Sequence, residues 1–400
     1  MSSSSSSSSF SSSSSSPFAS PAPTSPAPTS STAASSPSPL ASLGWDDSLT
    51  AELPDGLLPA RVSRVDRGAA EVLAAAGHLR ADYGARVRRA AAADPVALPC
   101  VGDWVGIRRL AEGRFELEAL LPRRTAFVRG GVSRVSRGGL SGDSQGQVLA
   151  ANVDVVFVAE PALHATDTAD LGRIERLLAL AWESGARPVV LVTKSDLIGE
   201  SLGDLLDEVA TAAPGVDVHP VCSVSGEGVD IVRGYLEGSR TAVILGASGA
   251  GKSTLVNALA GQEVMETQHV RAGDGRGRHT TVHRELIPLA GGGLVIDTPG
   301  IRRIGLYDMG EGVDMVFSDL EELAGRCRFG DCHHDTEPGC AVIAAIEDGT
   351  LPERRLESWK KLQREAAWMA SRSDARLRKE MHNKWKIITK EMRKTGRNRP

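Results

Sequence analysis

The chain carries the stretch Gly246-Ala-Ser-Gly-Ala-Gly251-Lys252-Ser253 between an apolar run, 241–245, and a helix-forming one, 254–259. It matches the pattern G-x-x-x-x-G-K-[ST] in a strand–loop–helix context. Glycines let the backbone curl so that successive N–H groups face phosphate oxygens, and the helix N-terminus adds a favourable partial positive charge. Lys252 can then reach the β- and γ-phosphates, and the Ser253 hydroxyl can bind Mg²⁺. The predicted phosphate loop comprises Gly246, Ala247, Ser248, Gly249, Ala250, Gly251, Lys252, Ser253 and Thr254.

Length and composition limit the classes of protein to which the chain can belong. Four hundred residues suit two or three domains. Residues 1–45 are almost all Ser, Pro, Ala and Thr and carry no charge, which predicts a disordered head, assigned to residues 1–50. The head lacks the basic start and apolar core of a signal peptide, and no stretch approaches about 18 consecutive apolar residues. We therefore expect a cytoplasmic protein with no membrane partner, and a monomer.

Charge is unevenly distributed along the chain. Residues 351–400 hold 16 Lys/Arg and 6 Asp/Glu, a balance of +10, whereas the whole chain has a net charge of -4. A basic tail on an acidic body favours a nucleic-acid partner, and an ordinary solvated helical face is the alternative. Leu356, Trp359 and Leu362 recur at helical spacing in this segment. Tryptophans at such spacing, Trp368 included, more often pack in a core than stack on RNA.

Short β-type runs punctuated by Gly, Asp and Pro fill the region between Leu57 and Leu121. They predict a five-stranded OB-fold barrel over residues 51–125, with Ala85–Ala90 among the expected strands. Such barrels often bind RNA, and the arginines of this region favour that reading over an accessory domain that uses arginine for solubility. The Gly- and Ser-rich residues 126–148 are expected to form a linker.

From Val153 onward, apolar strands alternate with amphipathic helices, which predicts a largely parallel sheet covered on both faces and a nucleotide-binding domain over residues 149–310. Thr193-Lys-Ser-Asp196 follows one strand and matches an [NT]-K-x-D guanine loop. The Asp196 carboxylate can accept hydrogen bonds from guanine N1–H and N2–H₂, which adenine cannot offer. A turn with a helix N-cap is the alternative. Ser223-Val-Ser225, after the next strand, can offer N–H groups to guanine O6. The guanine-binding set is Thr193, Lys194, Ser195, Asp196, Ser223, Val224 and Ser225.

Two further segments match the switches of a GTPase. Asp297-Thr-Pro-Gly300 follows an apolar strand, so Asp297 can hold Mg²⁺ and the Gly300 N–H can bond the γ-phosphate. A glycine-rich basic loop ends in Thr280 and Thr281, which both fit as a Mg²⁺ ligand, with a preference for Thr281. The guanine loop thus precedes the phosphate loop and the Asp-Thr-Pro-Gly switch follows it. This order is a circular permutation of an ordinary GTPase.

Three cysteines and two adjacent histidines lie within residues 327–340. Three thiolates and one imidazole, from either His333 or His334, fit a closed tetrahedral zinc site, which is structural rather than catalytic. Incidental loop cysteines are the alternative. We expect a mostly helical zinc-binding domain over residues 311–400, because a bound metal stabilises a region with a small core.

The combination resembles the RsgA (YjeQ) family of circularly permuted GTPases over roughly residues 57–390. The motifs that carry the resemblance are Leu121-Pro-Arg-Arg124, Ala150-Ala-Asn-Val-Asp154, Gly246–Thr254, Gly277-Arg-His-Thr-Thr281, Asp297-Thr-Pro-Gly300 and Glu337-Pro-Gly-Cys340.

This resemblance implies hydrolysis of GTP to GDP stimulated by the 30S ribosomal subunit, a role in late maturation of that subunit, and contact with 16S rRNA. It implies the zinc ligands Cys327, Cys332, His334 and Cys340. It also implies a catalytic role for His279 beside Lys252, since Ile301 stands where a water-orienting glutamine is found in Ras-like proteins. A loop histidine that only contacts rRNA is the alternative.

Two positions depart from the family pattern. Thr193 stands where Asn is common, which puts a supporting hydrogen bond in doubt, and Val282 stands where a third Thr is common. Two other functions compete with a GTPase: a P-loop ATPase or kinase, and a non-catalytic RNA-binding scaffold that holds nucleotide.

Overall fold

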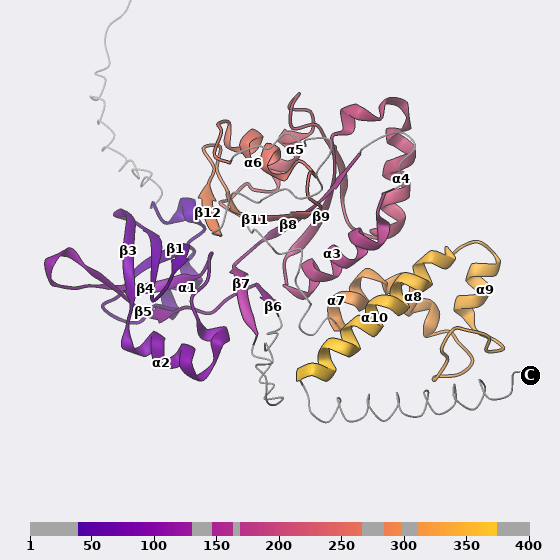
Figure 1. Ribbon diagram of the computed structural model, residues 1–400, viewed down its shortest axis with the longest axis horizontal. Helices are drawn as coiled ribbons and strands as arrows, with labels where there is room; N and C mark the ends of the chain where they lie inside the picture. Colours follow the sequence, from indigo (N-terminus) through magenta and orange to yellow (C-terminus); the bar gives the residue numbers. More distant parts are fainter. Residues whose placement is uncertain (1–38, 130–145, 163–168, 266–283, 298–309, 374–400) are drawn as a thin grey trace, which may run out of the picture. The chain divides into compact units, whose positions relative to one another are not determined.

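The computed structural model describes residues 39–129, 146–162, 169–265, 284–297 and 310–373. Its first region is a closed barrel of five strands in the order β1-β2-β3-β5-β4 (Figure 1). The strands are β1 (Leu58–Asp66), β2 (Ala69–Ala74), β3 (Gly77–Tyr83), β4 (Trp104–Arg109) and β5 (Phe115–Leu120). In β5, Leu117 and Ala119 are buried, whereas Glu116 and Glu118, which alternate with them, are only partly buried; this is the period of two that the sequence shows. The predicted barrel is confirmed.

One expected strand of the barrel is a helix. Ala85–Ala90 begins α2 (Ala85–Ala93), which lies between β3 and β4 in the chain. Alanine and arginine are among the strongest helix formers, and the segment contributes one buried apolar residue, Val87. Gly84 is the N-cap of this helix, and a Cβ on Gly84 would lie 2.9 Å from the Leu117 carbonyl oxygen. The prediction of a strand here is wrong because helix propensity outweighs a short alternation of apolar residues.

The end of the expected disordered head is ordered. Residues 41–43 form a 3₁₀ turn, η1 (Ala41–Leu43), and α1 (Asp47–Glu52) follows, N-capped by the Asp46 carboxylate. Leu43 and Leu49 are buried, and the Trp45 ring meets Trp104 edge to face with the ring centres 4.9 Å apart. These apolar side chains explain the difference, because they allow the segment to pack on the barrel.

A two-stranded antiparallel sheet lies where the sequence predicts a linker. It pairs β6 (Ala126–Arg129) with β7 (Gln147–Ala151). Phe127, Leu149 and Ala150 are buried in it. The apolar residues that flank the Gly- and Ser-rich stretch therefore form strands.

The second region is a six-stranded sheet in the order β10-β9-β8-β11-β13-β12. Its strands are β8 (Val155–Pro161), β9 (Arg187–Thr193), β10 (Val218–Val221), β11 (Thr241–Gly246), β12 (Glu285–Pro288) and β13 (Leu294–Asp297). All neighbours are parallel except β12, which runs antiparallel to β13 at the edge. Helices α3 (Leu171–Glu183) and α4 (Leu202–Ala212) share one core with the sheet, and α5 (Val229–Gly234) and α6 (Lys252–Ala260) share another. The middle residues of β8, β9 and β11 are apolar and buried, because both faces of the sheet are covered.

The third region is helical, as predicted. It contains α7 (Gly310–Val316), α8 (Ser318–Ala324), α9 (Ala341–Glu347) and the longer α10 (Glu353–Ser373) (Figure 1). Phe317, Leu320, Val342 and Leu362 form its buried interior. Within the parts of the chain that the structure describes, no helix combines the length and the hydropathy needed to cross a bilayer.

A buried arginine joins the barrel to the segments on either side of it. The Arg61 guanidinium donates to three main-chain carbonyls, those of Leu43, Gly102 (3.2 Å) and Asn152 (3.0 Å). Burial lowers the pKa of Arg61 to about 10. Gly102 has φ +90°, and a Cβ there would lie 2.1 Å from the Ala151 carbonyl oxygen. The barrel backbone therefore lies directly against β7, and the Arg61 guanidinium is satisfied by carbonyls across this junction.

The helical region meets α3 just as closely. A Cβ on Gly312 of α7 would lie 2.2 Å from the Ala179 carbonyl oxygen. The Gly312 N–H donates to Glu183 Oε2 at 3.0 Å. Only glycine allows this approach, so the first turn of α7 is held against α3.

Candidate functional site

The loops singled out in the sequence meet at one edge of the six-stranded sheet. Because β10, β9, β8, β11 and β13 are parallel, their carboxyl ends share that edge. Thr193 is paired with Val221, and Gly246 with Ala159, at the ends of neighbouring strands. In open α/β sheets, ligands bind outside the carboxyl ends of the strands. The segments 193–196, 223–225, 246–254 and Asp297 therefore surround one candidate site.

The phosphate loop has the geometry that its glycines predict. Gly246, Gly249 and Gly251 all have positive φ, and a Cβ on Gly246 would lie 2.3 Å from the Ala159 carbonyl oxygen. The loop curls around the Lys252 ammonium, which donates to the carbonyls of Gly246 (3.2 Å) and Ala247 (2.7 Å). Lys252 is also the first residue of α6. The backbone N–H groups at this helix start suit an anion.

Thr193 ties the second loop to the phosphate loop. It ends β9, is 1% exposed, and donates from Oγ1 to the Ala250 carbonyl at 2.9 Å. Lys194, directly after it, has the left-handed φ of +58°, whereas Asp196 is exposed at the rim. The threonine hydroxyl thus makes a bond between the two loops at the position where the resemblance put a supporting hydrogen bond in doubt.

The Ser223-Val224-Ser225 segment forms a tight turn after β10. Cys222 pairs with Glu227 across the turn, and the Cys222 Sγ accepts from the Ser225 N–H at 3.4 Å. Val224 at its tip is almost fully exposed. The buried cysteine holds the turn, so the loop is presented beside the guanine-loop candidate on the neighbouring strand.

Asp297 ends β13, the neighbour of β11, and is half-buried. The candidates His279, Thr280, Thr281 and Gly300 lie outside the residues that the structure describes. Their assignments remain predictions.

A buried ion pair at this edge was not found from the sequence. Glu160, near the end of β8, lies between the guanine-loop strand and the phosphate-loop strand and is buried. Its carboxylate accepts from Arg173 Nε at 3.1 Å and Nη2 at 2.5 Å, and from the Asp170 N–H at 3.3 Å. The feature of the sequence that could have indicated this pair is a carboxylate, Glu160, near the end of an otherwise apolar strand. The pair fixes the start of α3 against the sheet.

The Cys/His segment forms a compact cluster. Ligand atoms of Cys327, Cys332, His334 and Cys340 all lie within 4.8 Å of one another. The Cys327 and Cys340 sulfurs are 3.8 Å apart, and His334 Nδ1 is 3.6 Å and 3.4 Å from them. Tetrahedral zinc with bonds of about 2.3 Å to sulfur separates two thiolates by about 3.8 Å. The donor set and spacing fit such an ion, whereas the neighbouring His333 side chain lies outside the cluster.

Surrounding residues hold the cluster in shape. The Glu337 carboxylate accepts from the N–H groups of His333, Asp335 and Thr336, and hydrogen bonds from backbone N–H groups lower its pKa to about 2. From α10, Lys360 Nζ donates to the His334 carbonyl at 2.9 Å, and the Trp359 ring packs on the His334 ring. The first part of α10 therefore depends on the same loop that presents the ligands.

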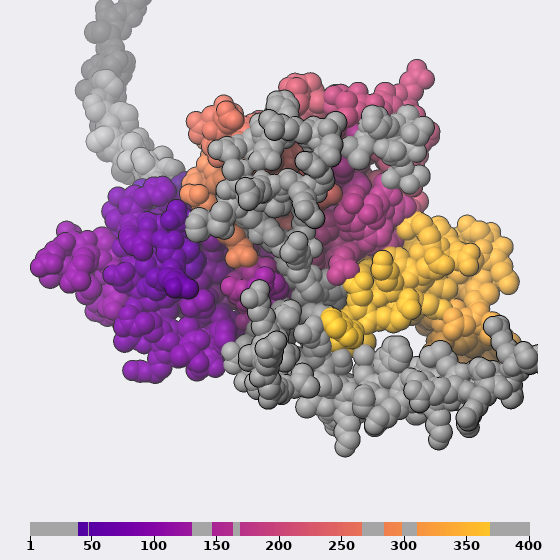
Figure 2. All heavy atoms as spheres, viewed as in Figure 1, coloured from indigo at the N-terminus to yellow at the C-terminus, as the bar shows by residue number. Residues whose placement is uncertain are grey.

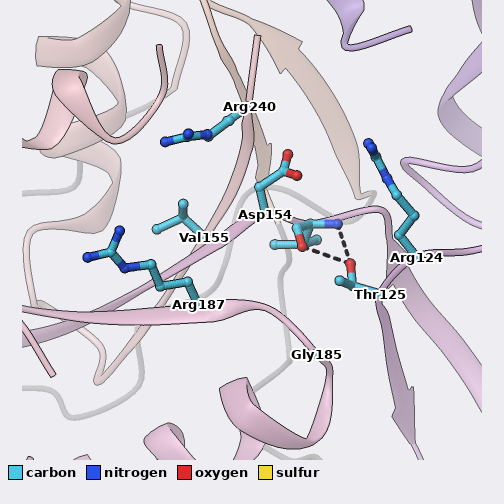
Figure 3. Close-up of a pocket in the computed structure, with 8 residues that line it drawn as sticks. Arg124, Thr125, Asp154, Val155, Gly185, Arg187 and Arg240 are labelled. Carbon is cyan, nitrogen blue, oxygen red and sulfur yellow. Dashed lines mark hydrogen bonds between the residues drawn. The ribbon is translucent and has the colours of Figure 1, made fainter. Parts of the chain in front are cut away.

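A cavity of about 330 Å³ lies at the opposite edge of the sheet, at the amino ends of β8, β9 and β11 (Figure 3). Arg124, Arg187 and Arg240 line it around Asp154, whose carboxylate accepts from the Thr241 N–H. Thr125 links to Val153 by the two hydrogen bonds drawn in Figure 3. None of the nucleotide-site candidates within the described ranges lines this cavity, so it is separate from the loops at the carboxyl edge.

The phosphate loop, the guanine-loop sequence and their places at neighbouring strand ends define a P-loop GTPase whose loops occur in permuted order. A family model described as RsgA GTPase matches residues 121–307. A small ribosomal subunit biogenesis GTPase RsgA from Streptomyces coelicolor is 50% identical over 355 residues, which cover 87% of this chain and 92% of the relative. A Listeria monocytogenes relative of the same description, RsgA 2, is 40% identical, with coverage of 76% and 83%. The chain belongs to the RsgA GTPase family, a family of GTP hydrolases.

Solved structures agree on the fold. YjeQ from Thermotoga maritima is 23% identical, with a TM-score of 0.56 and coverage of 77% of this chain and 98% of that one. YloQ, described as a circularly permuted GTPase, is 24% identical with a TM-score of 0.54 and coverage of 78% and 96%. At these identities the likeness concerns architecture alone.

Proposed function

We propose that this protein binds GTP at the carboxyl edge of its sheet, hydrolyses it to GDP and phosphate, and acts in biogenesis of the small ribosomal subunit. The observation that carries the proposal is the Thr193–Ala250 hydrogen bond, which joins a guanine-type loop to a phosphate-type loop. The identity of 50% over 355 residues to a relative described as a small ribosomal subunit biogenesis GTPase supports the biological role.

In the proposed site the residues divide by the part of GTP that they contact. The N–H groups and side chains of residues 246–254 hold the phosphates, and Lys252 moves from its loop carbonyls to the β- and γ-phosphates. Asp196 reads the guanine edge and the 223–225 turn faces guanine O6. An exposed Asp196 at the rim suits this task, because its carboxylate is open to a ligand.

Two metals complete the proposal. Ser253, Thr281 and Asp297 would hold Mg²⁺, which neutralises charge on the β- and γ-phosphates when bound. Cys327, Cys332, His334 and Cys340 would hold one structural Zn²⁺, since four protein ligands leave no open position. The Zn²⁺ assignment is supported by the spacing of the Cys/His cluster.

Hydrolysis is a phosphoryl transfer from GTP to water. Lys252 stabilises charge that develops on the transferred group, and His279 orients the water, because Ile301 cannot do so. Such a site turns over slowly until His279 is positioned against the attacking water. The 30S subunit, with its 16S rRNA, is the partner that positions it, and a monomer in the cytoplasm carries out the reaction.

The test is the rate of GTP hydrolysis by the full chain with and without 30S subunits. We expect strong stimulation, and equal rates would favour a nucleotide-holding scaffold. Asp196→Asn should relax the preference for GTP over ATP, whereas Asp207→Asn, the same change at another exposed aspartate, on α4, should leave it intact. Unchanged selectivity in Asp196→Asn would favour an ATPase or kinase.

A further inference from the structure

The outer face of α10 carries an exposed tryptophan. Its two tryptophans differ sharply: Trp359 is 8% exposed and donates from Nε1 to Glu321 Oε1 at 3.1 Å, whereas Trp368 is 51% exposed. Trp359 packs in the interior of the helical region, as its spacing predicts. Trp368 does not follow that prediction, because about half of its surface is exposed.

Two cations share the face with Trp368. Lys361, Arg364 and Trp368 are three and four residues apart, which places them on one side of the helix. With Glu365 they line a hollow of about 310 Å³. Figure 2 shows part of the surface of α10 in yellow. We call Lys361, Arg364 and Trp368 the Trp368 platform.

Among the described residues that line the hollow, the one carboxylate is that of Glu365, and it is already engaged. Glu365 Oε2 pairs with Arg176 Nη1 of α3 at 2.5 Å. Within the described ranges, neither Lys361 nor Arg364 forms an ion pair, and Arg364 Nε donates to the Lys360 carbonyl at 3.0 Å. The platform therefore presents uncompensated positive charge beside an aromatic face.

This combination matches the chemistry of an unpaired nucleotide. A base can stack on an exposed indole whatever its identity, and its phosphate is attracted by adjacent Lys and Arg side chains. An acidic peptide would use the cations but not the flat ring, and a duplex keeps its bases stacked inside. We infer that the Trp368 platform binds an unpaired nucleotide of RNA, its base on Trp368 and its phosphate against Lys361 and Arg364. The inference rests on the proposed function only in taking ribosomal RNA as the source.

The experiment measures binding of the full chain to a fluorescein-labelled single-stranded RNA of about ten nucleotides, without self-complementarity, and to a duplex of that sequence. Trp368→Ala should weaken binding of the single strand about 5- to 100-fold, and Trp368→Phe should retain most of it because the ring remains. Met315→Ala, which truncates a side chain of similar exposure on α7, is the matched control and should change nothing. Far-ultraviolet circular dichroism verifies that each variant is folded.

A local readout separates this platform from other basic parts of the chain. Stacking on Trp368 should quench part of the tryptophan emission when the single strand is added, and Trp368→Phe should lose that part. The double change Lys361→Gln with Arg364→Gln should reduce the slope of log affinity against log salt by about 1.4, since single strands give about 0.7 per phosphate contact.

Equal single-strand affinity in wild type and Trp368→Ala would overturn the inference. So would an equal loss for the duplex, because stacking requires an unpaired base. If Trp368→Ala weakened binding to 30S particles but not to the oligonucleotide, the occupant would be a protein and the RNA assignment would be wrong. These measurements use neither GTP nor turnover, so failure of the proposed GTPase cycle would appear separately, as absent 30S stimulation in wild type.

Discussion

Glu175 of α3 and Arg355 of α10 form an ion pair of 3.0 Å in which the side chains are 0% and 1% exposed. Glu175 also accepts from Arg354 Nη1 at 3.0 Å and from the Ser358 hydroxyl at 2.5 Å. Arg355 donates further to the Asp319 carboxylate and to the Val316 carbonyl. One carboxylate of the GTPase domain thus meets donors from three positions of α10, and the interface is specified by charge as well as by apolar packing.

Removing Glu175 should loosen α10. Glu175→Ala leaves the buried Arg355 short of a partner, and breaking a buried pair from one side costs about 3 kcal/mol. Because a chain of several domains need not unfold in one step, hydrogen exchange of the α10 amides is the appropriate measurement. Arg176→Ala on the same helix breaks the more exposed pair with Glu365 and should cost less than about 1 kcal/mol. Similar protection of the α10 amides from hydrogen exchange in both variants would contradict the role assigned to Glu175.

The Thr193 hydroxyl should be necessary for nucleotide affinity. Thr193→Val keeps the shape but removes the donor to the Ala250 carbonyl, and leaving a buried acceptor without its partner costs about 1–3 kcal/mol. We expect GDP and GTP affinity to fall about 5- to 100-fold, measured by calorimetric titration. Thr193→Ser retains the hydroxyl and should bind like wild type. Equal affinity in all three proteins would show that the loops are positioned without this bond.

Metal content should depend on the Cys/His cluster. The purified chain should hold about one zinc ion, and Cys327→Ser should lose it, because three ligands bind zinc far more weakly than four. Cys100→Ser, at a buried cysteine outside the cluster, should keep the metal. Chelation should expose α10 to proteolysis, since Lys360 donates to the His334 carbonyl. Elemental analysis that finds less than about half an equivalent in wild type would count against the site.

Tyr83 should make the barrel sensitive to high pH. Its side chain is buried, and its hydroxyl has no hydrogen-bond partner among the residues that the structure describes. Burial, followed by the charge of Asp103, raises the pKa of Tyr83 from 10.0 to about 12. The unfolded chain therefore ionises first, so stability is complete below about pH 10 and falls by about 2 kcal/mol as the pH rises towards 12.

Tyr83→Phe should remove this alkaline loss and stabilise the protein by about 1 kcal/mol at pH 7, because an unpartnered buried hydroxyl is unfavourable. Tyr235→Phe is the contrasting change. The Tyr235 hydroxyl donates to Asp217 Oδ2 at 2.8 Å, so its removal should lower stability at pH 7. Urea unfolding at pH 7 and pH 10.5 checks both, with the transition of the region that carries each tyrosine followed separately. A loss of stability in Tyr83→Phe at pH 7 would show that its hydroxyl is satisfied.

Local sequence predicted the elements whose residues suit one conformation only. The period of two in β5 and the Gly246–Ser253 pattern each left one reasonable fold, and the order of the loops along the chain indicated the permutation. The prediction of a strand over Ala85–Ala90 was wrong because a short Ala/Arg run fits either a strand or a helix, and the surrounding fold decides between them. The prediction of disorder was wrong for residues 39–53. Their few apolar side chains become ordered only by packing on a barrel, here against Trp104 and its neighbours.

The residues of the site could be predicted where the chemistry of the ligand allows few residue types. They could not be predicted where their role depends on tertiary contacts. Gly246, Lys252 and the Cys/His cluster were recognisable because phosphate and zinc accept few alternatives. Glu160 and Glu175 were missed, since a carboxylate in an apolar strand or helix says nothing of the arginine that neutralises it. That Thr193 bonds to Ala250 also follows only from how closely β9 and the phosphate loop approach.

The Arg61 junction has a consequence for synthesis of the chain from its amino end. All five barrel strands have been made once residue 120 is complete, yet one carbonyl that satisfies Arg61 belongs to Asn152. Until that residue emerges, a folded barrel holds a buried cation short of an acceptor, a state that costs free energy. We therefore expect the nascent barrel to mature only when the start of the next domain has been translated, and a fragment ending at residue 125 to be less stable than its complete set of strands suggests.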